Sequence, residues 1–102
     1  MYWVSEDGYL KKCFAKVPTI ATRMVVDELV LVPILRDEGI IGKSHVLNGV
    51  AVHIWELLDG QRRVADIRDM LAEEFDISAE VAEADLGKLI QYLEQIGFVR
   101  SV

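Results

Sequence analysis

Residues 47–99 read LNGVAVHIWELLDGQRRVADIRDMLAEEFDISAEVAEADLGKLIQYLEQIGFV. Apolar residues recur in this stretch every three or four positions, which is the spacing of the buried face of an amphipathic helix. The pattern predicts three successive helices, at about residues 49–58, 64–75 and 78–97. We expect Asn48 and Ser78 to be the N-caps of the first and third helices, because their side-chain oxygens can accept first-turn amides.

The residues before this stretch have the composition of β-strands. Two runs rich in β-branched residues, IATRMVV (20–26) and LVLVPIL (29–35), flank the polar pair Asp27–Glu28 and predict a hairpin. Pro33 cannot donate a ladder hydrogen bond, so we expect an edge position, a bulge or a strand end there. Residues 43–47 (KSHVL) predict a short third strand. The predicted fold class is therefore α+β and winged helix-turn-helix-like, with a three-stranded antiparallel sheet followed by three helices.

The length of the chain predicts a single domain, because 102 residues can bury one modest core. Residues 1–17 have no clear hydrophobic period and form a predicted N-terminal arm, which could dock on its own domain, exchange between protomers or fray. Residues 18–102 form the predicted domain, and residues 98–99 are expected to end it as an extended segment.

Composition predicts a cytoplasmic protein. No run of about 18 apolar residues is present, so we expect no transmembrane helix. The first residues, MYWVSEDGYLKKC, are acidic where a signal peptide is basic, and no apolar stretch follows them. The single cysteine, Cys13, excludes an internal disulfide and fits a reducing compartment.

Catalytic, metal-binding and cofactor-binding motifs are missing from the sequence. His45, His53 and Cys13 match no known spacing of metal ligands. There is no phosphate-binding glycine loop, no nucleophile elbow and no metal-binding helix motif. We therefore expect no enzyme activity, no cofactor and no metal, and a protein that acts by binding.

The chain resembles the PqqD-like family of small peptide chaperones, also called RiPP precursor peptide recognition elements. The family pattern L-N…A…I-W-x-L-L-D-G…V-x-x-I is matched by Leu47–Asn48, Ala51, IWELLDG (54–60), Val64 and Ile67. The family is also similar in three other segments: the predicted strand sequence ELVLVP (28–33), the acidic helix 81–93 and the C-terminal IGFV (96–99). The resemblance therefore covers about residues 16–100. Gly49 stands where an acid is usual, and Arg63 stands where a threonine usually caps the second helix.

The resemblance implies a protein that captures the leader segment of a ribosomally synthesised precursor peptide and presents it to a modifying enzyme, such as a radical SAM protein. The implied setting is the synthesis of pyrroloquinoline quinone or a related peptide product. The leader would add as a β-strand to the open edge of the third strand and lie against the third helix. The implied peptide-binding residues are Lys43, Ser44, His45, Val46 and Leu47 on the strand, and Asp85, Lys88, Leu89, Tyr92 and Leu93 on the helix.

Two other functions are compatible with this architecture. A winged-helix DNA-binding regulator would place the third helix in the major groove and would need basic side chains there. Residues 78–97 contain one cation, Lys88, against four acids, and the net charge of the chain is −6, so contact with phosphates is disfavoured. A pure assembly module would instead form a homodimer by exchanging the N-terminal arm between protomers.

Overall fold

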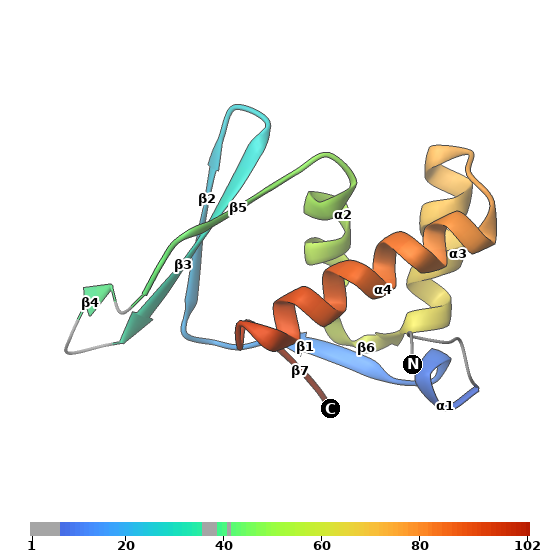
Figure 1. The fold of residues 1–102 in the computed structure, drawn as a ribbon, viewed down its shortest axis with the longest axis horizontal. Helices are drawn as coiled ribbons and strands as arrows, with labels where there is room; N and C mark the ends of the chain where they lie inside the picture. The colour runs from blue at the N-terminus through green and yellow to red at the C-terminus, as the bar shows by residue number, and fades with distance from the viewer. Residues whose placement is uncertain (1–6, 36–38, 41) are drawn as a thin grey trace.

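The computed structural model describes residues 7–35, 39–40 and 42–102 and places a β-sheet beside a group of helices (Figure 1). The sheet occupies one side of the molecule, the longer helices occupy the other, and a second small sheet runs beneath the helices. Buried side chains from the first sheet and from the helices belong to one cluster. The two layers therefore share a single core.

The first sheet is antiparallel, with β3 (Glu28–Leu35) in its middle. β2 (Ile20–Val25) pairs with one side of β3 and β5 (His45–Asn48) with the other. The short β4 (Gly39–Ile40) pairs with the far end of β3. This order of elements confirms the predicted α+β class, because β2, β3 and β5 form a three-stranded antiparallel sheet, which β4 extends, and the long helices follow it.

The turn between β2 and β3 lies one residue earlier than predicted. Val25 pairs with Glu28, so Val26 and Asp27 form a two-residue turn and Glu28 belongs to the strand. Val26 has a φ of 59°, a left-handed conformation that β-branched residues rarely adopt. The predicted turn pair Asp27–Glu28 is wrong because the register of the hairpin, rather than local polarity, decides which residues turn.

Pro33 lies inside the central strand, at the point where pairing with β5 has ended. Ile34 donates its N–H to the carbonyl of Thr19, at the base of β2, over 2.9 Å. Since successive residues of a strand direct their polar groups to opposite sides, the main chain of Pro33 faces the β5 side. β5 pairs with β3 only as far as Leu31. Among the described residues, Pro33 therefore has no strand partner on this side, and its missing N–H removes none of the bonds between β3 and β5.

The helices α2 (Val50–Leu57), α3 (Val64–Phe75) and α4 (Ala79–Gln95) confirm the three predicted from periodicity. Ser78 caps α4 as predicted, since its Oγ accepts the N–H of Val81 over 3.1 Å. The prediction that Asn48 caps α2 is wrong. Asn48 pairs with Glu28 inside β5, and Gly49 takes the N-cap position with a φ of 58°.

The core is formed by apolar side chains from the first sheet and from all three helices. Leu31 on β3, Leu71 on α3, and Leu86 and Ile90 on α4 have an exposed fraction of 0%. Each such side chain contributes roughly 1.5–3 kcal/mol of burial free energy. In the part of the chain that the structure describes, no helix has the length and apolar character needed to cross a membrane.

The second sheet joins three segments that are far apart in the sequence. β1 (Cys13–Lys16), which follows the short helix α1 (Asp7–Leu10), lies between β6 (Asp59–Arg63) and β7 (Val99–Ser101). Phe14 of β1 is only 2% exposed and belongs to the core. Residues 13–16 of the predicted arm thus pair with strands of residues 59–63 and 99–101 in the same chain.

Candidate functional site

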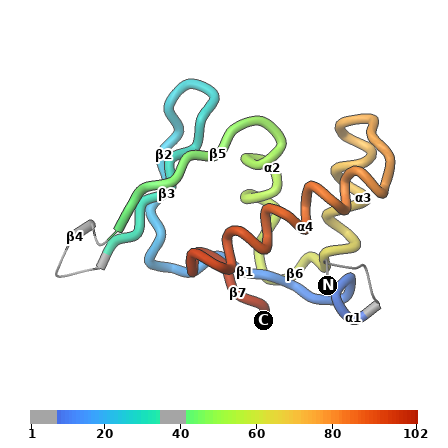
Figure 2. The backbone as a smooth tube through the Cα atoms, viewed as in Figure 1, coloured from blue at the N-terminus to red at the C-terminus, as the bar shows by residue number. Residues whose placement is uncertain are grey.

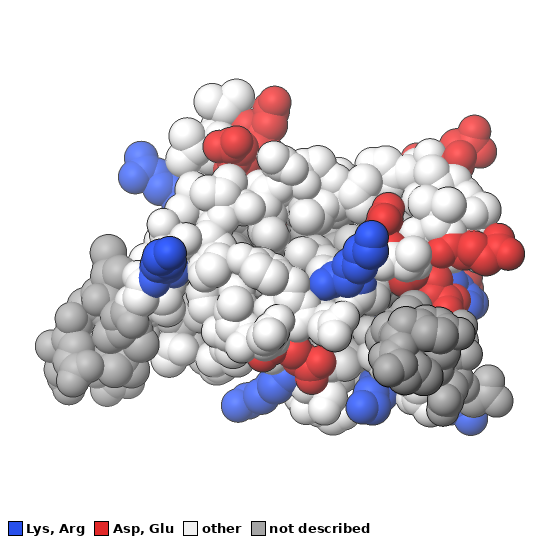
Figure 3. Space-filling view, in the orientation of Figure 1, with Lys and Arg blue, Asp and Glu red and all other residues white. Residues whose placement is uncertain are grey.

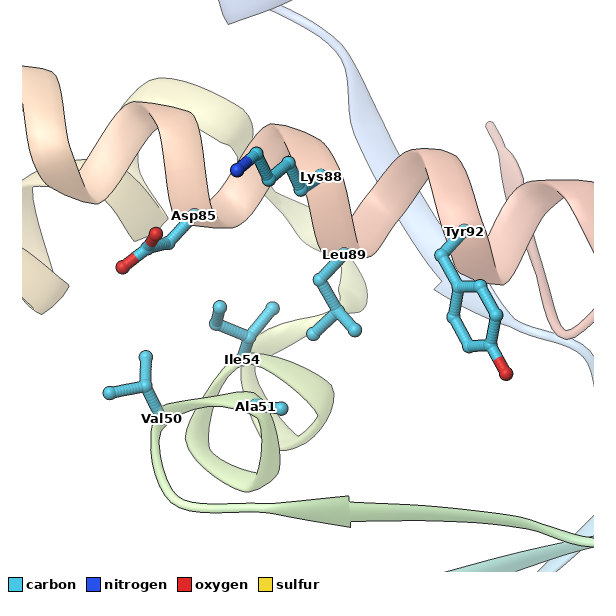
Figure 4. A pocket seen from close by; sticks show the side chains of 7 residues that line it. All are labelled: Val50, Ala51, Ile54, Asp85, Lys88, Leu89 and Tyr92. Atoms are coloured by element: carbon cyan, nitrogen blue, oxygen red, sulfur yellow. The ribbon is translucent and has the colours of Figure 1, made fainter.

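A groove lies between the N-terminal part of α2 and the middle of α4 (Figure 4). It has a volume of about 360 Å³. In Figure 4 the side chains of Leu89 and Ile54 approach each other across the groove, and the Tyr92 ring hangs from α4 at one end. The lining residues are Val50, Ala51 and Ile54 from α2, and Asp85, Lys88, Leu89 and Tyr92 from α4.

Four of the five helix residues implied by the resemblance lie at this groove, namely Asp85, Lys88, Leu89 and Tyr92. The fifth, Leu93, is 0% exposed and belongs to the core instead. The reason is helix geometry. Each residue turns the helix by about 100°, so Leu93 follows the inward direction of Leu86 and Ile90 rather than that of Tyr92.

The side of the groove that α2 forms was not predicted from the sequence. Val50, Ala51 and Ile54 form one side of it, and their apolar side chains read equally well as helix core. Val50 and Ala51 remain only partly buried, whereas Ile54 is 1% exposed. The one sequence feature that relates them to the strand edge is their position in the first turns of the helix that follows β5.

β5 presents an open edge next to this groove. In the register of β3 and β5, Leu29 pairs with Leu47 and Leu31 pairs with His45. Since alternate residues of β3 bond to β2, the main-chain groups of these two pairs bond to each other. The N–H and carbonyl of Val46, between them, therefore face outward. No residue that the structure describes forms a hydrogen bond with them. Val46 is thus the centre of an unpaired edge.

The other strand residues implied by the resemblance have different surroundings. Lys43 and Ser44 are exposed and precede the first residue of β5. The side chain of Leu47 is 5% exposed and packs in the core. Val46 is 52% exposed, because its side chain lies on the opposite face of the sheet from Leu47. What Val46 offers at the edge is therefore mainly its outward-facing backbone.

His45 joins the edge strand to the helix across the groove. Its Nδ1 atom lies 2.5 Å from the hydroxyl of Tyr92, and its ring meets the Tyr92 ring edge-on with centroids 5.7 Å apart. The same imidazole contacts Phe98 edge-on, at 5.2 Å between centroids. The hydrogen bond and ring contact with Tyr92 hold β5 against the C-terminal half of α4, and the contact with Phe98 holds it against the segment that follows the helix.

The groove is apolar at its base, and its charges lie at the rim. Asp85 and Lys88 are exposed, and neither forms an ion pair with another described residue. Figure 3 shows that uncharged side chains make up most of the middle of this face, with most charged groups around it. Within the described ranges, no group of three or more His, Cys, Asp or Glu side chains could hold a metal ion. This arrangement is suited to holding an extended apolar segment.

These elements define a class of small α+β domains, in which an edge strand and a following helix flank an apolar groove. The chain belongs to the PqqD family, since the profile described as coenzyme PQQ synthesis protein D (PqqD) matches residues 28–99. The match begins at β3 and includes β5, all three long helices and the start of β7. Both walls of the groove therefore lie within the family region.

Two known proteins are similar to this chain. The PqqA binding protein of Gluconobacter oxydans (strain 621H) is 42% identical over 53 residues, which cover 52% of this chain and 55% of that protein. The chain thus matches about half the length of that relative. TbiB1, solved in complex with the TbiA(beta) leader peptide, has a TM-score of 0.70 and 23% identity over 84% of this chain and 94% of TbiB1. This likeness shows a shared fold.

Proposed function

We propose that this protein is a non-catalytic adaptor that binds the leader segment of a ribosomally synthesised precursor peptide by β-strand addition. The leader pairs with the edge of β5 and lies in the groove against α4. The adaptor then presents the peptide to a modifying enzyme, such as a radical SAM protein, in the cytoplasm. The proposed contact residues are Lys43, Ser44, His45 and Val46 at the edge, and Asp85, Lys88, Leu89 and Tyr92 on the helix, with Leu47 and Leu93 supporting them from the core.

The observation that carries this proposal is the unpaired edge at Val46 beside an apolar groove. A strand added at this edge would form main-chain hydrogen bonds, which give affinity for peptides of varied sequence. Its alternate side chains would point toward the helices and enter the groove. Val50, Ile54 and Leu89 would then select apolar side chains, while Asp85 and Lys88 would contact polar ones at the rim.

The relatives support the same mode of action. The similar protein of Gluconobacter oxydans is named as a binder of PqqA, and TbiB1 was solved with a leader peptide. The family match spans the strand edge and the helix that would hold such a peptide. Synthesis of pyrroloquinoline quinone, or of a related peptide product, is therefore the setting that we propose.

The charge of α4 argues against a DNA-binding regulator. The helix carries Lys88 as its one basic residue, against Glu80, Glu83, Asp85 and Glu94. A recognition helix in the major groove lies between two rows of phosphates, which this helix would repel. No feature of the described residues favours the regulator over the peptide adaptor.

The experiment that tests the proposal is an amide-resolved NMR titration of the full chain with the leader half of the precursor peptide encoded beside its gene. We expect shifts at residues 43–48 and 85–92 in the wild-type protein. The decisive variant is Val46→Pro, which removes the outward N–H and leaves the bonds of His45 and Leu47 to β3 in place. We expect its peptide affinity to fall by about tenfold or more. This change corresponds to the loss of one hydrogen bond between uncharged groups, taken at the upper end of its net free energy.

The matched control is Thr22→Pro, which removes an outward N–H from the opposite edge of the same sheet. This variant should bind the peptide as the wild type does. Circular dichroism and the dispersion of the amide spectrum establish that both variants are folded. A folded Val46→Pro protein with unchanged peptide affinity would rule out strand addition at β5. Intact-mass measurement of the peptide after incubation with the chain alone tests the non-catalytic role.

A further inference from the structure

The first sheet has a second open edge, along β2. Thr19 accepts the N–H of Ile34, so the alternate residues of β2 that follow it, Ala21 and Arg23, direct their main chain toward β3. Thr22 and Met24 therefore direct theirs outward. No described residue forms a hydrogen bond with these groups. This edge and the β5 edge lie on opposite sides of β3.

The β2 edge has few of the features that usually prevent strands from associating. Such edges are normally protected by charged side chains, prolines or bulges. β2 pairs without interruption over six residues, and its one charged residue is Arg23. Its end is apolar and exposed, with exposed fractions of 53% for Met24, 45% for Val25 and 89% for Val26. The hairpin that carries these residues stands clear of the helices (Figure 2).

Each face of the sheet has a hollow along this edge. On the helix side, a hollow of about 480 Å³ lies between Trp55 and the side chains of Ile20, Thr22 and Met24. A second hollow, of about 330 Å³, lies at the base of β2 and is lined by residues 18–21 and Ile34. Both hollows adjoin unpaired backbone. An added strand would therefore find side-chain sites on both faces.

We propose that β2 pairs antiparallel with β2 of a second copy of this chain, about a two-fold axis at Thr22. The outward groups of Thr22 then bond to those of Thr22 in the second copy, and Ile20 lies opposite Met24. In the same register, Val25 lies opposite Thr19 and Val26 opposite Pro18. The exposed apolar tip of each copy therefore meets the hollow at the base of β2 in the other.

The neighbouring registers are less favourable. An axis at Arg23 would place two guanidinium groups directly opposite each other, and like charges in that position are destabilising. An axis at Ala21 would place Met24 opposite Pro18, which has no N–H to donate. The axis at Thr22 keeps the two Arg23 side chains apart, and Pro18 then lies opposite Val26, a turn residue that needs no ladder bond. It also places Ile20 opposite Met24, so two apolar side chains meet. This reciprocal fit of tip and hollow is the reason for proposing a second copy as the occupant.

The resulting dimer would carry a continuous sheet with a β5 edge at each end. Both peptide grooves would remain open, because they lie on the far side of β3 from the interface. The proposal goes beyond peptide binding and does not depend on it. It also differs from the arm exchange expected from the sequence, since β1 is already paired on both sides within its own chain.

Sedimentation equilibrium of the full chain tests the proposal. We expect a reversible dimer in the wild-type protein. Thr22→Glu places two carboxylates opposite each other at the axis and should raise the dimer dissociation constant by about tenfold or more. Thr22→Pro should have a similar effect by removing the outward N–H. The matched controls, Val46→Glu and Val46→Pro on the other edge, should dimerise as the wild type does.

A crosslinking experiment tests the register. In a Cys13→Ser background, Thr22→Cys should form a disulfide between copies under mild oxidation, because a hydrogen-bonded antiparallel pair has Cα atoms about 5.5 Å apart. Arg23→Cys should crosslink much less, since Arg23 would lie opposite Ala21. Stronger crosslinking of Arg23→Cys than of Thr22→Cys would overturn the proposed axis.

A wild-type protein that stays monomeric up to roughly 1 mM, a concentration at which even weak association is detected, would overturn the dimer. A dimer that persists unchanged in folded Thr22→Glu would do the same. If the chain is monomeric and the β2 amides shift only when the modifying enzyme is added, the edge belongs to that enzyme and the second copy is excluded. None of these results depends on whether the precursor peptide binds.

Discussion

The Nδ1 atom of His45 lies 2.5 Å from the hydroxyl of Tyr92 and thereby links the edge strand β5 to the helix α4. The two residues come from opposite walls of the proposed peptide site. Because the imidazole also rests edge-on against the buried ring of Phe98, the strand edge is anchored to the core as well as to the helix. The spacing between edge and helix is therefore set before any peptide arrives.

Removing the hydroxyl should loosen this link. We expect Tyr92→Phe to lower the free energy of unfolding by about 0.5–1.5 kcal/mol, the net value of a single hydrogen bond. Peptide affinity should fall as well, since the edge and the helix would no longer be held at one spacing. Urea unfolding and peptide titration measure the two effects. If Tyr92→Phe has the same effect in a His45→Phe background as in the wild type, the hydrogen bond is not its cause.

Two leucines of α4 should separate stability from binding. Leu86 is 0% exposed, so Leu86→Ala should cost about 2–5 kcal/mol of unfolding free energy through the cavity it leaves. Leu89 is partly buried and lines the groove, so Leu89→Ala should cost less stability and should weaken peptide binding. Chemical unfolding and peptide titration of both variants provide the comparison. Unchanged peptide affinity in Leu89→Ala would remove Leu89 from the proposed site.

The cap of α4 gives a prediction for stability alone. Ser78 Oγ accepts the N–H of Val81, and loss of such a cap typically costs about 1 kcal/mol. We therefore expect Ser78→Ala to lower the melting temperature while the peptide affinity stays the same, because the groove begins further along the helix, at Asp85. Ser78→Asp, which can accept the same amide, should retain the stability. An equal loss in both variants would mean that the cap bond is not responsible.

The start of α3 gives a prediction for pH dependence. Hydrogen bonds from the Arg63 guanidinium, followed by one from the Arg63 backbone N–H, lower the pKa of the Asp66 carboxyl below its ordinary value of 3.8. A carboxyl whose pKa is lower in the folded protein than in the unfolded chain stabilises the fold above the unfolded pKa. That stabilisation is lost as the pH falls through the folded pKa.

We therefore expect the stability difference between wild type and Asp66→Asn to be constant near neutral pH and to shrink as the pH falls below about 4. Urea unfolding across this range measures the difference. Asp69→Asn on the next turn is a suitable control, since Asp69 bonds to the side chain of Arg68 and to no helix-start amide. A difference for Asp66→Asn that persists unchanged in acid would show that the Arg63 contact does not favour the charged carboxylate.

The parts of the fold that were predictable from the sequence alone are those decided by neighbours in the chain. The helical period placed α3 at Val64–Phe75, and the cap at Ser78 is a contact between residues three positions apart. Helix spacing places Asp85, Lys88, Leu89 and Tyr92 on one side of α4, and the family resemblance implied that this side meets a peptide. The family pattern then related that side to a strand edge.

Contacts between distant segments were decided only by the tertiary structure. The second sheet pairs Cys13 with Arg63 and Phe14 with Ser101, and no local pattern in these segments specifies such partners. Asn48 has the chemistry of a helix cap, yet strand pairing with Glu28 takes it away from α2. Val50 lines the groove because the start of α2 lies across from the middle of α4, and Leu93 is buried because the rest of the fold covers that side of α4. The sequence determines the chemistry and the spacing of the side chains. Whether an apolar side chain lies in the core or lines the groove depends on which surface packs against it, and only the tertiary structure decides that.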